Sequence, residues 1–195
     1  TLELDVVLSA DGVPMVLHDL RLHPDIARGP DGQWVAAPGP AVGQLTAAQL
    51  QAWDVGRLRP GSPTAQSFPQ QQAADGQRIP TLAQVLALAG RPGAGQVRFD
   101  IETKRDPRDP QAPDPALFAR AVLDAVRAAG VLERSTLQSF DWRTLRAAQA
   151  LAPQLPTACL SAQRPNFDTL RAADPAGSPW TAGLRLADHG SVPRL

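Results

Sequence analysis

The chain has 195 residues, an apolar content of 43%, a mean hydropathy of -0.20 and a formal net charge of +0. These values favour one globular domain with a hydrophobic core, and they offer no basic surface for nucleic acid or anionic lipid. No apolar run reaches the ~18 residues that a membrane span needs, and the single cysteine, Cys159, has no partner for an internal disulfide.

The first 19 residues predict a β-hairpin, and the residues after it predict a long irregular segment. Strand-like runs lie on both sides of Asp11-Gly12, a pair typical of tight turns. Residues 20–80 are rich in Pro, Gly and Gln, and they contain one predicted short helix that starts at the capping box of Thr46 and Gln49. A segment of this length inside a compact domain is usually functional.

After residue 80, helix-like and strand-like segments alternate. In chain order they are a helix at 81–89, a strand at 96–104, a helix at 115–129, a strand at 135–140, a helix at 141–151, a strand at 156–161, a short helix at 166–173 and a strand at 181–186. This order predicts parallel βα units. Carboxylates near strand ends favour a TIM barrel over a doubly wound sheet, because the chain lacks a glycine-rich phosphate turn.

Two of the predicted strands carry charged residues at a spacing of two. Glu3 and Asp5 share one strand face, which we expect to be the core face, and Glu102 shares a face with Lys104, the only lysine in the chain. Buried carboxylates require a positive partner. Three carboxylates together suit a hard divalent cation, although Glu3 or Glu102 paired with an arginine is the alternative.

Two further polar residues adjoin these strands. His18 ends the second strand of the hairpin, where it could act as a general acid or base beside an acidic site. A capping or partly buried histidine is the alternative for this position. We expect Asp100 to face outward into the helix layer or to reach a turn, and therefore to have a structural role.

Five short segments follow one another along the chain: Glu3-Leu-Asp-Val, Asp11–Asp19, Arg78–Leu82, Phe99–Lys104 and Gln138-Ser-Phe. Together and in this order, they resemble the glycerophosphodiester phosphodiesterase family. The long segment after the hairpin resembles the exported bacterial branch of the family. The resemblance implies an α/β fold, a TIM (β/α)8 barrel of the phospholipase-C-like phosphodiesterase type. Residues 1–195 would form this single domain, with residues 20–80 inserted after the second strand.

The resemblance also implies a site and a reaction. Glu3, Asp5 and Glu102 match the family's ligands for Ca²⁺ or Mg²⁺, Lys104 matches its phosphate contact, and His18 matches one of its two catalytic histidines. The implied reaction is hydrolysis of a small-molecule glycerophosphodiester to glycerol 3-phosphate and an alcohol, in the periplasm or outside the cell. A lysophospholipase D, a phospholipase C-like enzyme and a truncated barrel that only binds metal or phosphate are the alternatives.

The family pattern has further segments that these 195 residues do not match. They are a first strand with His-Arg-Gly, a helix with Pro-Glu-Asn-Thr, and closing strands with a Trp-Thr-Val-like run. We therefore expect a barrel that is incomplete at both ends. Expressed alone, residues 1–195 should lack turnover and should associate through an open sheet edge.

Overall fold

The computed structural model describes residues 1–171, 174 and 176–192, and it divides the chain into two compact units. The first unit contains Thr1–Asp5 and Leu86–Leu195, and the second contains Val6–Val85, so that the predicted insertion lies inside the second unit. The strands are β1 (Leu2–Leu8), β2 (Pro14–Val16), β3 (Phe99–Thr103), β4 (Ser135–Ser139), β5 (Thr157–Cys159), β6 (Gln163–Arg164) and β7 (Phe167–Asp168).

The helices are mostly short. The α-helices are α1 (Ala47–Leu50), α2 (Pro63–Ser67), α3 (Leu82–Leu86), α4 (Pro115–Ala128), α5 (Trp142–Leu151) and α6 (Leu186–His189). Single 3-10 turns are found at Val42–Gln44, Ala87–Gly90, Ala94–Gln96 and Leu132–Arg134. None of the helices in the described ranges has the length and apolar character needed to cross a bilayer.

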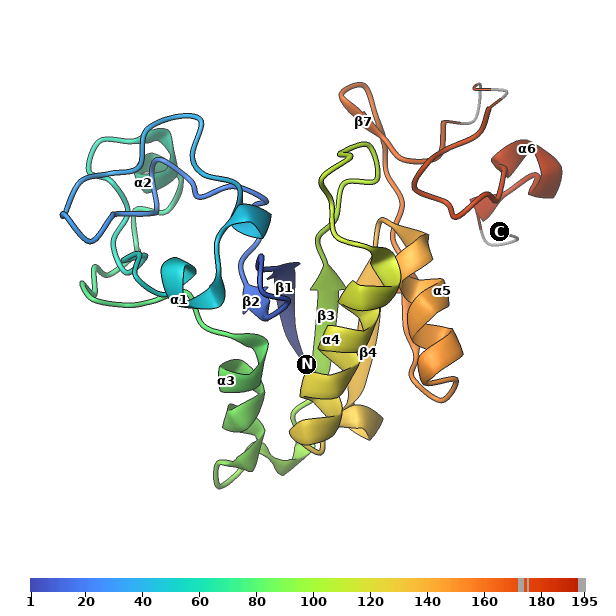
Figure 1. Ribbon diagram of the computed structural model, residues 1–195, viewed down its shortest axis with the longest axis horizontal. Coiled ribbons are helices and arrows are strands. Elements are labelled where there is room, and N and C mark those ends of the chain that lie inside the picture. Colours follow the sequence, from blue (N-terminus) through green and yellow to red (C-terminus); the bar gives the residue numbers. More distant parts are fainter. Residues whose placement is uncertain (172–173, 175, 193–195) are drawn as a thin grey trace. The chain divides into compact units, whose positions relative to one another are not determined.

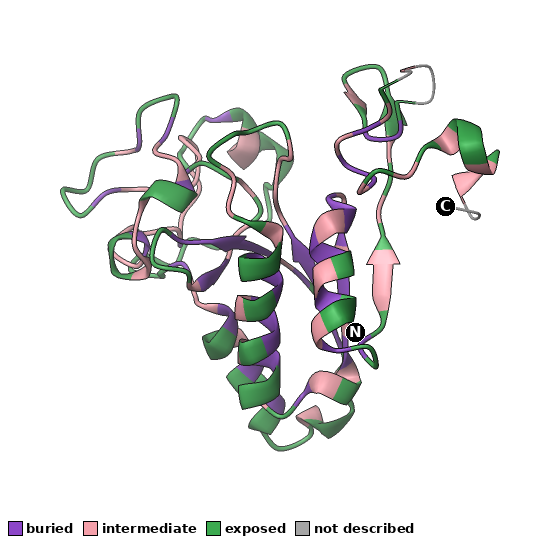
Figure 2. Cartoon of the chain, turned by 45° about the vertical axis from the view of Figure 1, so that its right-hand side comes forward, coloured by how far each residue is buried: buried purple, intermediate pink, exposed green. Residues whose placement is uncertain are grey.

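The first unit is built on a parallel sheet in which β1, β3, β4 and β5 are neighbours in that order (Figure 1). In this register Phe99 lies opposite Ser135, and Leu137 lies opposite Thr157. Helices α4 and α5 pack against each other and bury their apolar sides toward the sheet (Figure 2). The predicted βα alternation is therefore confirmed for the strand segments near 99 and 135 and for both long helices.

Two predictions near the C-terminal end are wrong. The predicted helix at 166–173, whose last two residues lie outside the described part, is instead the strand β7, which pairs antiparallel with β6 across a Pro165-Asn turn. The Asp168 carboxylate accepts from the backbone N–H groups of Leu170 and Arg171, a local bond that competes with a helix.

The second wrong prediction is the strand at 181–186. The chain turns at 181–183 and enters α6 at Leu186. The hydroxyl of Thr181 donates to the carbonyl of Leu184, and Gly183 adopts a φ of 89°, a left-handed conformation that closes a turn and that few other residues adopt.

The second unit consists mainly of loops around a small apolar core. Its β2 pairs antiparallel with the end of β1, Val6 opposite Val16 and Leu8 opposite Pro14. Its core contains Val7, Met15, Leu22, Ala27, Val35, Val42, Leu50 and Ile79.

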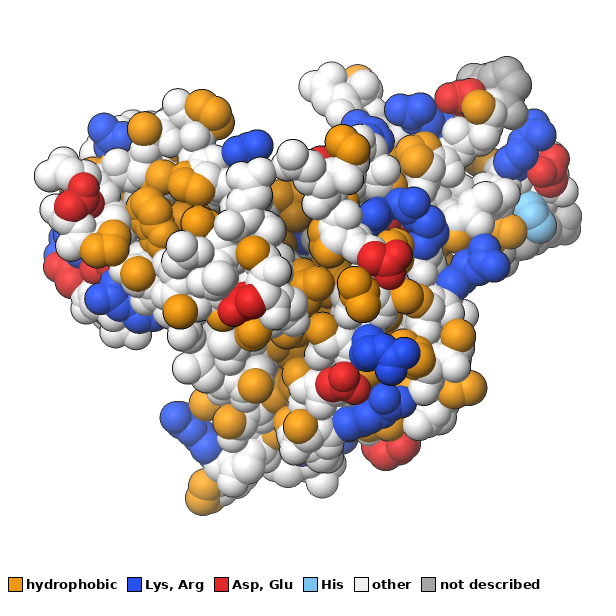
Figure 3. Space-filling model, viewed as in Figure 1, with side chains coloured by type: hydrophobic (Ala, Val, Ile, Leu, Met, Phe, Trp, Pro, Cys, Tyr) orange, Lys and Arg blue, Asp and Glu red, His pale blue; other side chains and the backbone are white. Residues whose placement is uncertain are grey.

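On the face shown in Figure 3, cationic and anionic side chains are interspersed, in keeping with the formal net charge of +0.

Asp54 joins three separate segments of this second unit. Its carboxylate accepts hydrogen bonds from the backbone of Gly56 at 3.0 Å and of Gly76 at 2.8 Å, and from the Arg28 guanidinium at 2.6 Å. The two backbone donors, followed by Arg28, lower the pKa of Asp54 to about 2. Because this value lies below the unfolded pKa of about 3.9, the ionised carboxylate stabilises the fold above about pH 4 and loses that effect as the pH falls toward 2.

Replacement of Asp54 by Asn should therefore destabilise the chain in a pH-dependent way. We expect a free energy of unfolding about 1–3 kcal/mol lower at pH 7, since one acceptor and the charge are lost. The difference from wild type should shrink as the pH falls from 4 toward 2. Denaturant titrations followed by circular dichroism measure both effects. Asp31→Asn, at an exposed position of the same unit, is the control and should stay within about 0.5 kcal/mol of wild type.

Candidate functional site

Three carboxylates come together on one face of the parallel sheet. Glu3 and Asp5 on β1 and Glu102 on β3 each offer an oxygen, and these oxygens lie within 4.8 Å of one another. The arrangement follows from the strands, because β1 and β3 are sheet neighbours and residues two apart on a strand share a face. Glu102 is buried, Asp5 is half-buried and Glu3 is exposed, so the expected core environment holds for Glu102 but not for Glu3.

Lys104 supplies the positive charge beside this acidic cluster. Its Nζ lies 2.7 Å from Oε1 of Glu102 and 3.1 Å from Oδ1 of Asp5. Burial lowers the pKa of Lys104, but its hydrogen bonds and charge attraction to the two carboxylates more than offset this, so the net pKa is raised. The structure therefore pairs Glu102 with the single lysine of the chain rather than with an arginine.

The buried carboxyl of Glu102 feels opposing influences. Burial raises its pKa, the Lys104 ammonium lowers it, and the negative charges of Asp5 and Glu3 raise it further, with a net upward shift. At the exposed end of the cluster, Nε2 of Gln138 on β4 donates to Oε1 of Glu3 at 3.1 Å. Gln138 belongs to the Gln138-Ser-Phe segment of the sequence, but the sequence pattern alone gave it no role.

The donor chemistry of this cluster fits a hard divalent cation. All three residues offer carboxylate oxygens, which Ca²⁺ and Mg²⁺ prefer and which are less typical of zinc sites built from His and Cys. Within the described residues, Glu3, Asp5 and Glu102 form the one group of three or more acidic, histidine or cysteine side chains that lie close enough together to share an ion.

Asp100 is placed differently from the sequence expectation. It lies two residues before Glu102 and therefore shares the face of the acidic cluster, whereas its neighbours Phe99 and Ile101 are buried on the opposite face. One of its carboxylate oxygens is buried without a hydrogen-bond partner, and burial raises the pKa of Asp100. The spacing of two was the signal that should have assigned Asp100 to this face.

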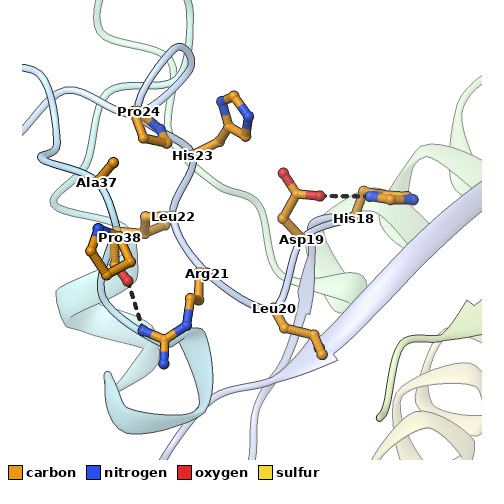
Figure 4. A pocket seen from close by; sticks show the side chains of 10 residues that line it. His18, Asp19, Leu20, Arg21, Leu22, His23, Pro24, Ala37 and Pro38 are labelled. Atoms are coloured by element: carbon orange, nitrogen blue, oxygen red, sulfur yellow. Dashed lines mark hydrogen bonds and ion pairs between the residues drawn. The ribbon is translucent and has the colours of Figure 1, made fainter. Parts of the chain in front are cut away.

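His18 belongs to the second unit and follows β2. Its side chain is exposed, and its Nδ1 lies 2.8 Å from Oδ1 of Asp19. His18 and Asp19 line part of a hollow of about 540 Å³. The other residues that line this hollow are Leu20, Arg21, Leu22, His23, Pro24, Ala37, Pro38 and Gly39. The guanidinium of Arg21, whose hydrogen bond is dashed in Figure 4, donates to the carbonyl of Gly39 at 2.9 Å.

The parallel strands, the helices that cover them and the carboxylates on β1 and β3 define an α/β protein. The sequence model of the glycerophosphoryl diester phosphodiesterase family matches residues 1–184, and the chain belongs to that family, whose fold is of the TIM-barrel type. The resemblance found from the five short segments is therefore confirmed. No curated protein matches the chain.

Solved structures of several family members are similar to the chain. One from Silicibacter pomeroyi DSS-3, a glycerophosphoryl diester phosphodiesterase by name, is 34% identical with a TM-score of 0.76, and the match covers 85% of this chain and 55% of that one. A phosphodiesterase from Oleispira antarctica, solved with the product sn-glycerol-3-phosphate, is 21% identical with a TM-score of 0.55, and the match covers 84% of this chain and 55% of that one. The chain thus spans about half the length of these relatives.

Proposed function

We propose that this chain carries the metal and phosphate site of a glycerophosphodiester phosphodiesterase, which releases glycerol 3-phosphate and an alcohol. The observation that carries the proposal is the cluster of Glu3, Asp5 and Glu102, with oxygens within 4.8 Å of one another and Lys104 bonded to two of them, in a member of this family. The product bound to the Oleispira antarctica relative supports the same substrate class.

Each residue has a role in this proposal. Glu3, Asp5 and Glu102 hold Ca²⁺ or Mg²⁺, which when bound neutralises phosphate charge and makes the attacking oxygen more acidic. The Lys104 ammonium donates to the phosphoryl oxygens as their charge develops. It is already desolvated and bonded to two carboxylates, and it remains charged because its pKa is raised.

His18 protonates the oxygen of the leaving alcohol in this proposal. Its partner Asp19 accepts from Nδ1 when that nitrogen carries the proton, which leaves Nε2 to transfer a proton to the alcohol. We further propose a periplasmic or secreted location, because residues 20–80 resemble the exported bacterial branch of the family.

The reaction is tested with the complete gene product that carries these 195 residues. Incubation with glycerophosphocholine or glycerophosphoethanolamine should release glycerol 3-phosphate, which a coupled dehydrogenase assay measures. A chelator should stop the release, and Ca²⁺ or Mg²⁺ should restore it. Absence of glycerol 3-phosphate with either substrate and either metal would contradict the proposal. If the protein released choline from lysophosphatidylcholine faster than it released glycerol 3-phosphate from the glycerophosphodiesters, it would instead be a lysophospholipase D.

A further inference from the structure

The residues on both sides of Lys104 are bonded to the end of β4. The hydroxyl of Ser139, the last residue of β4, donates to the carbonyl of Thr103 at 3.0 Å. On the other side, Nη1 of Arg105 lies 2.5 Å from Oδ2 of Asp141. The backbone of Lys104 is therefore held from both directions by one short segment of the neighbouring strand and its loop.

This Arg105–Asp141 ion pair is almost completely removed from water. The side chain of Asp141 is 0% exposed and that of Arg105 is 8% exposed. Nε of Arg105 also donates to the carbonyl of Pro113, just before α4, at 2.6 Å. Asp141 is in turn the N-cap of α5, since its carboxylate accepts from the backbone N–H of Arg143. A buried pair with this many hydrogen bonds is costly to break, so its geometry is fixed.

A fixed backbone matters for a lysine in particular. The lysine side chain is long and flexible, and its ammonium is a point charge without the rigid fork of arginine. The position of Nζ therefore depends on where the backbone of residue 104 is held. Nζ must lie within hydrogen-bond distance of Glu102 and Asp5 and, in the proposed function, of a phosphate as well.

We propose that Arg105 and Asp141 are positioning residues, which hold the backbone of Lys104 so that its ammonium reaches the acidic cluster and the substrate phosphate. The phosphate part of this inference rests on the proposed function, whereas the position of Nζ beside Glu102 does not. The buried pair thus links the end of β4 to the reactive end of β3.

The structure supplies a matched control. Arg143 binds the same carboxylate, with Nε at 2.8 Å from Oδ1 and Nη2 at 2.8 Å from Oδ2 of Asp141. Arg143 is 37% exposed and lies on α5, distant in sequence from Lys104. Arg105→Gln and Arg143→Gln each remove one guanidinium from Asp141 and leave the other in place, so Asp141 is never left as an unpaired buried charge.

The first measurement uses the fact that Lys104 is the only lysine in the chain. With ¹⁵N-lysine labelling, residues 1–195 contribute a single side-chain ammonium signal, that of Lys104. In wild type, the carboxylates of Glu102 and Asp5 should protect this ammonium from exchange with solvent. Arg105→Gln should move the signal toward that of a free lysine and broaden it, whereas Arg143→Gln should leave it in place. Ser139→Ala, a milder change on the other side of Lys104, should shift it in the same direction as Arg105→Gln.

The second measurement is a double-mutant cycle on turnover in the complete gene product. Arg105→Gln should lower kcat by roughly 10- to 100-fold, the size expected for a misplaced contact, and Arg143→Gln should change it by less than about 3-fold. In a Lys104→Ala background, Arg105→Gln should have no further effect, because both changes remove the same contact.

The outcomes separate the two proposals. Equal losses from Arg105→Gln in both backgrounds, or an unmoved ammonium signal, would show that the ion pair only supports the fold and would overturn the positioning role. If wild type released no glycerol 3-phosphate, the proposed function would fail, while the ammonium signal would still decide whether Arg105 positions Lys104.

Discussion

Glu102→Gln should abolish metal-dependent turnover and weaken the binding of Ca²⁺ and Mg²⁺. The substitution keeps the shape of the side chain but removes the buried one of the three clustered carboxylates. Loss of an outer-sphere partner of a metal ligand typically costs about 10- to 100-fold in affinity or activity. Loss of the charge of a ligand itself should therefore lower cation affinity and activity by more than about 100-fold. Isothermal titration with each cation and the glycerol 3-phosphate assay measure the two effects.

The stability of this variant separates a metal ligand from a structural acid. Burial raises the pKa of Glu102, so its ionised form is less favourable in the folded chain than in the unfolded chain. This cost is present once the pH exceeds the folded-state pKa and disappears below the unfolded value. Without metal at pH 7, the Tm of Glu102→Gln should therefore stay close to that of wild type, because relief of this cost offsets the lost charge attraction to Lys104, which keeps its bond to Asp5.

The control is Glu133→Gln, which removes a carboxylate from an exposed position in the same unit. Its cation affinity and turnover should match those of wild type. If Glu102→Gln bound Ca²⁺ and Mg²⁺ as tightly as wild type, the three carboxylates would be an acidic cluster neutralised by Lys104 and no more.

The sequence could predict those parts of the fold that depend on neighbouring residues. Helices α4 and α5 have apolar residues at helical spacing, and Asp114 and Asp141 cap them, with side chains accepting from the first backbone N–H groups. The convergence of Glu3, Asp5 and Glu102 depends on strand periodicity and on β1 and β3 being neighbours, both of which follow from parallel βα units.

The sequence could not predict bonds that join distant segments. The pairing of Arg105 with Asp141 spans 36 residues and has no local pattern. In the C-terminal part, the side chains of Asp168 and Thr181 make short-range bonds, and the chain forms the strand β7 in place of the predicted helix and a turn in place of the predicted strand. The placement of Asp100 needed no structure, since a spacing of two already assigns it to the face of Glu102.

His18→Ala should lower kcat for glycerophosphocholine by roughly 10²–10⁴-fold, the usual size of a general acid–base contribution. The fold should be unaffected, because the His18 side chain is 69% exposed and its hydrogen bond is to the adjacent Asp19. The free energy of unfolding should accordingly stay within about 0.5 kcal/mol of wild type. Loss of activity with unchanged stability would separate a role in proton transfer from a role in folding.

The control histidine lies in the same hollow. His23 is half-buried, and its Nδ1 accepts from the backbone N–H of Asp25 at 3.1 Å, so its part in the structure is to hold a turn. His23→Ala should lower the Tm more than His18→Ala, and it should change kcat by only a few fold. The reverse ranking of the two variants in the turnover assay would assign the acid to His23.

The leaving group distinguishes a general acid from any other role of His18. A choline or ethanolamine alkoxide is strongly basic and needs a proton as its bond to phosphorus breaks, whereas p-nitrophenolate is a stable anion that leaves without one. For a p-nitrophenyl ester of glycerol phosphate, His18→Ala should therefore retain most of the wild-type kcat, while it loses roughly 10²–10⁴-fold with glycerophosphocholine. Lys104→Ala, which removes a contact to the phosphate itself, should impair both substrates alike. A His18→Ala loss of equal size on the two substrates would mean that His18 acts before the leaving group departs, and the assignment of proton donor would be wrong.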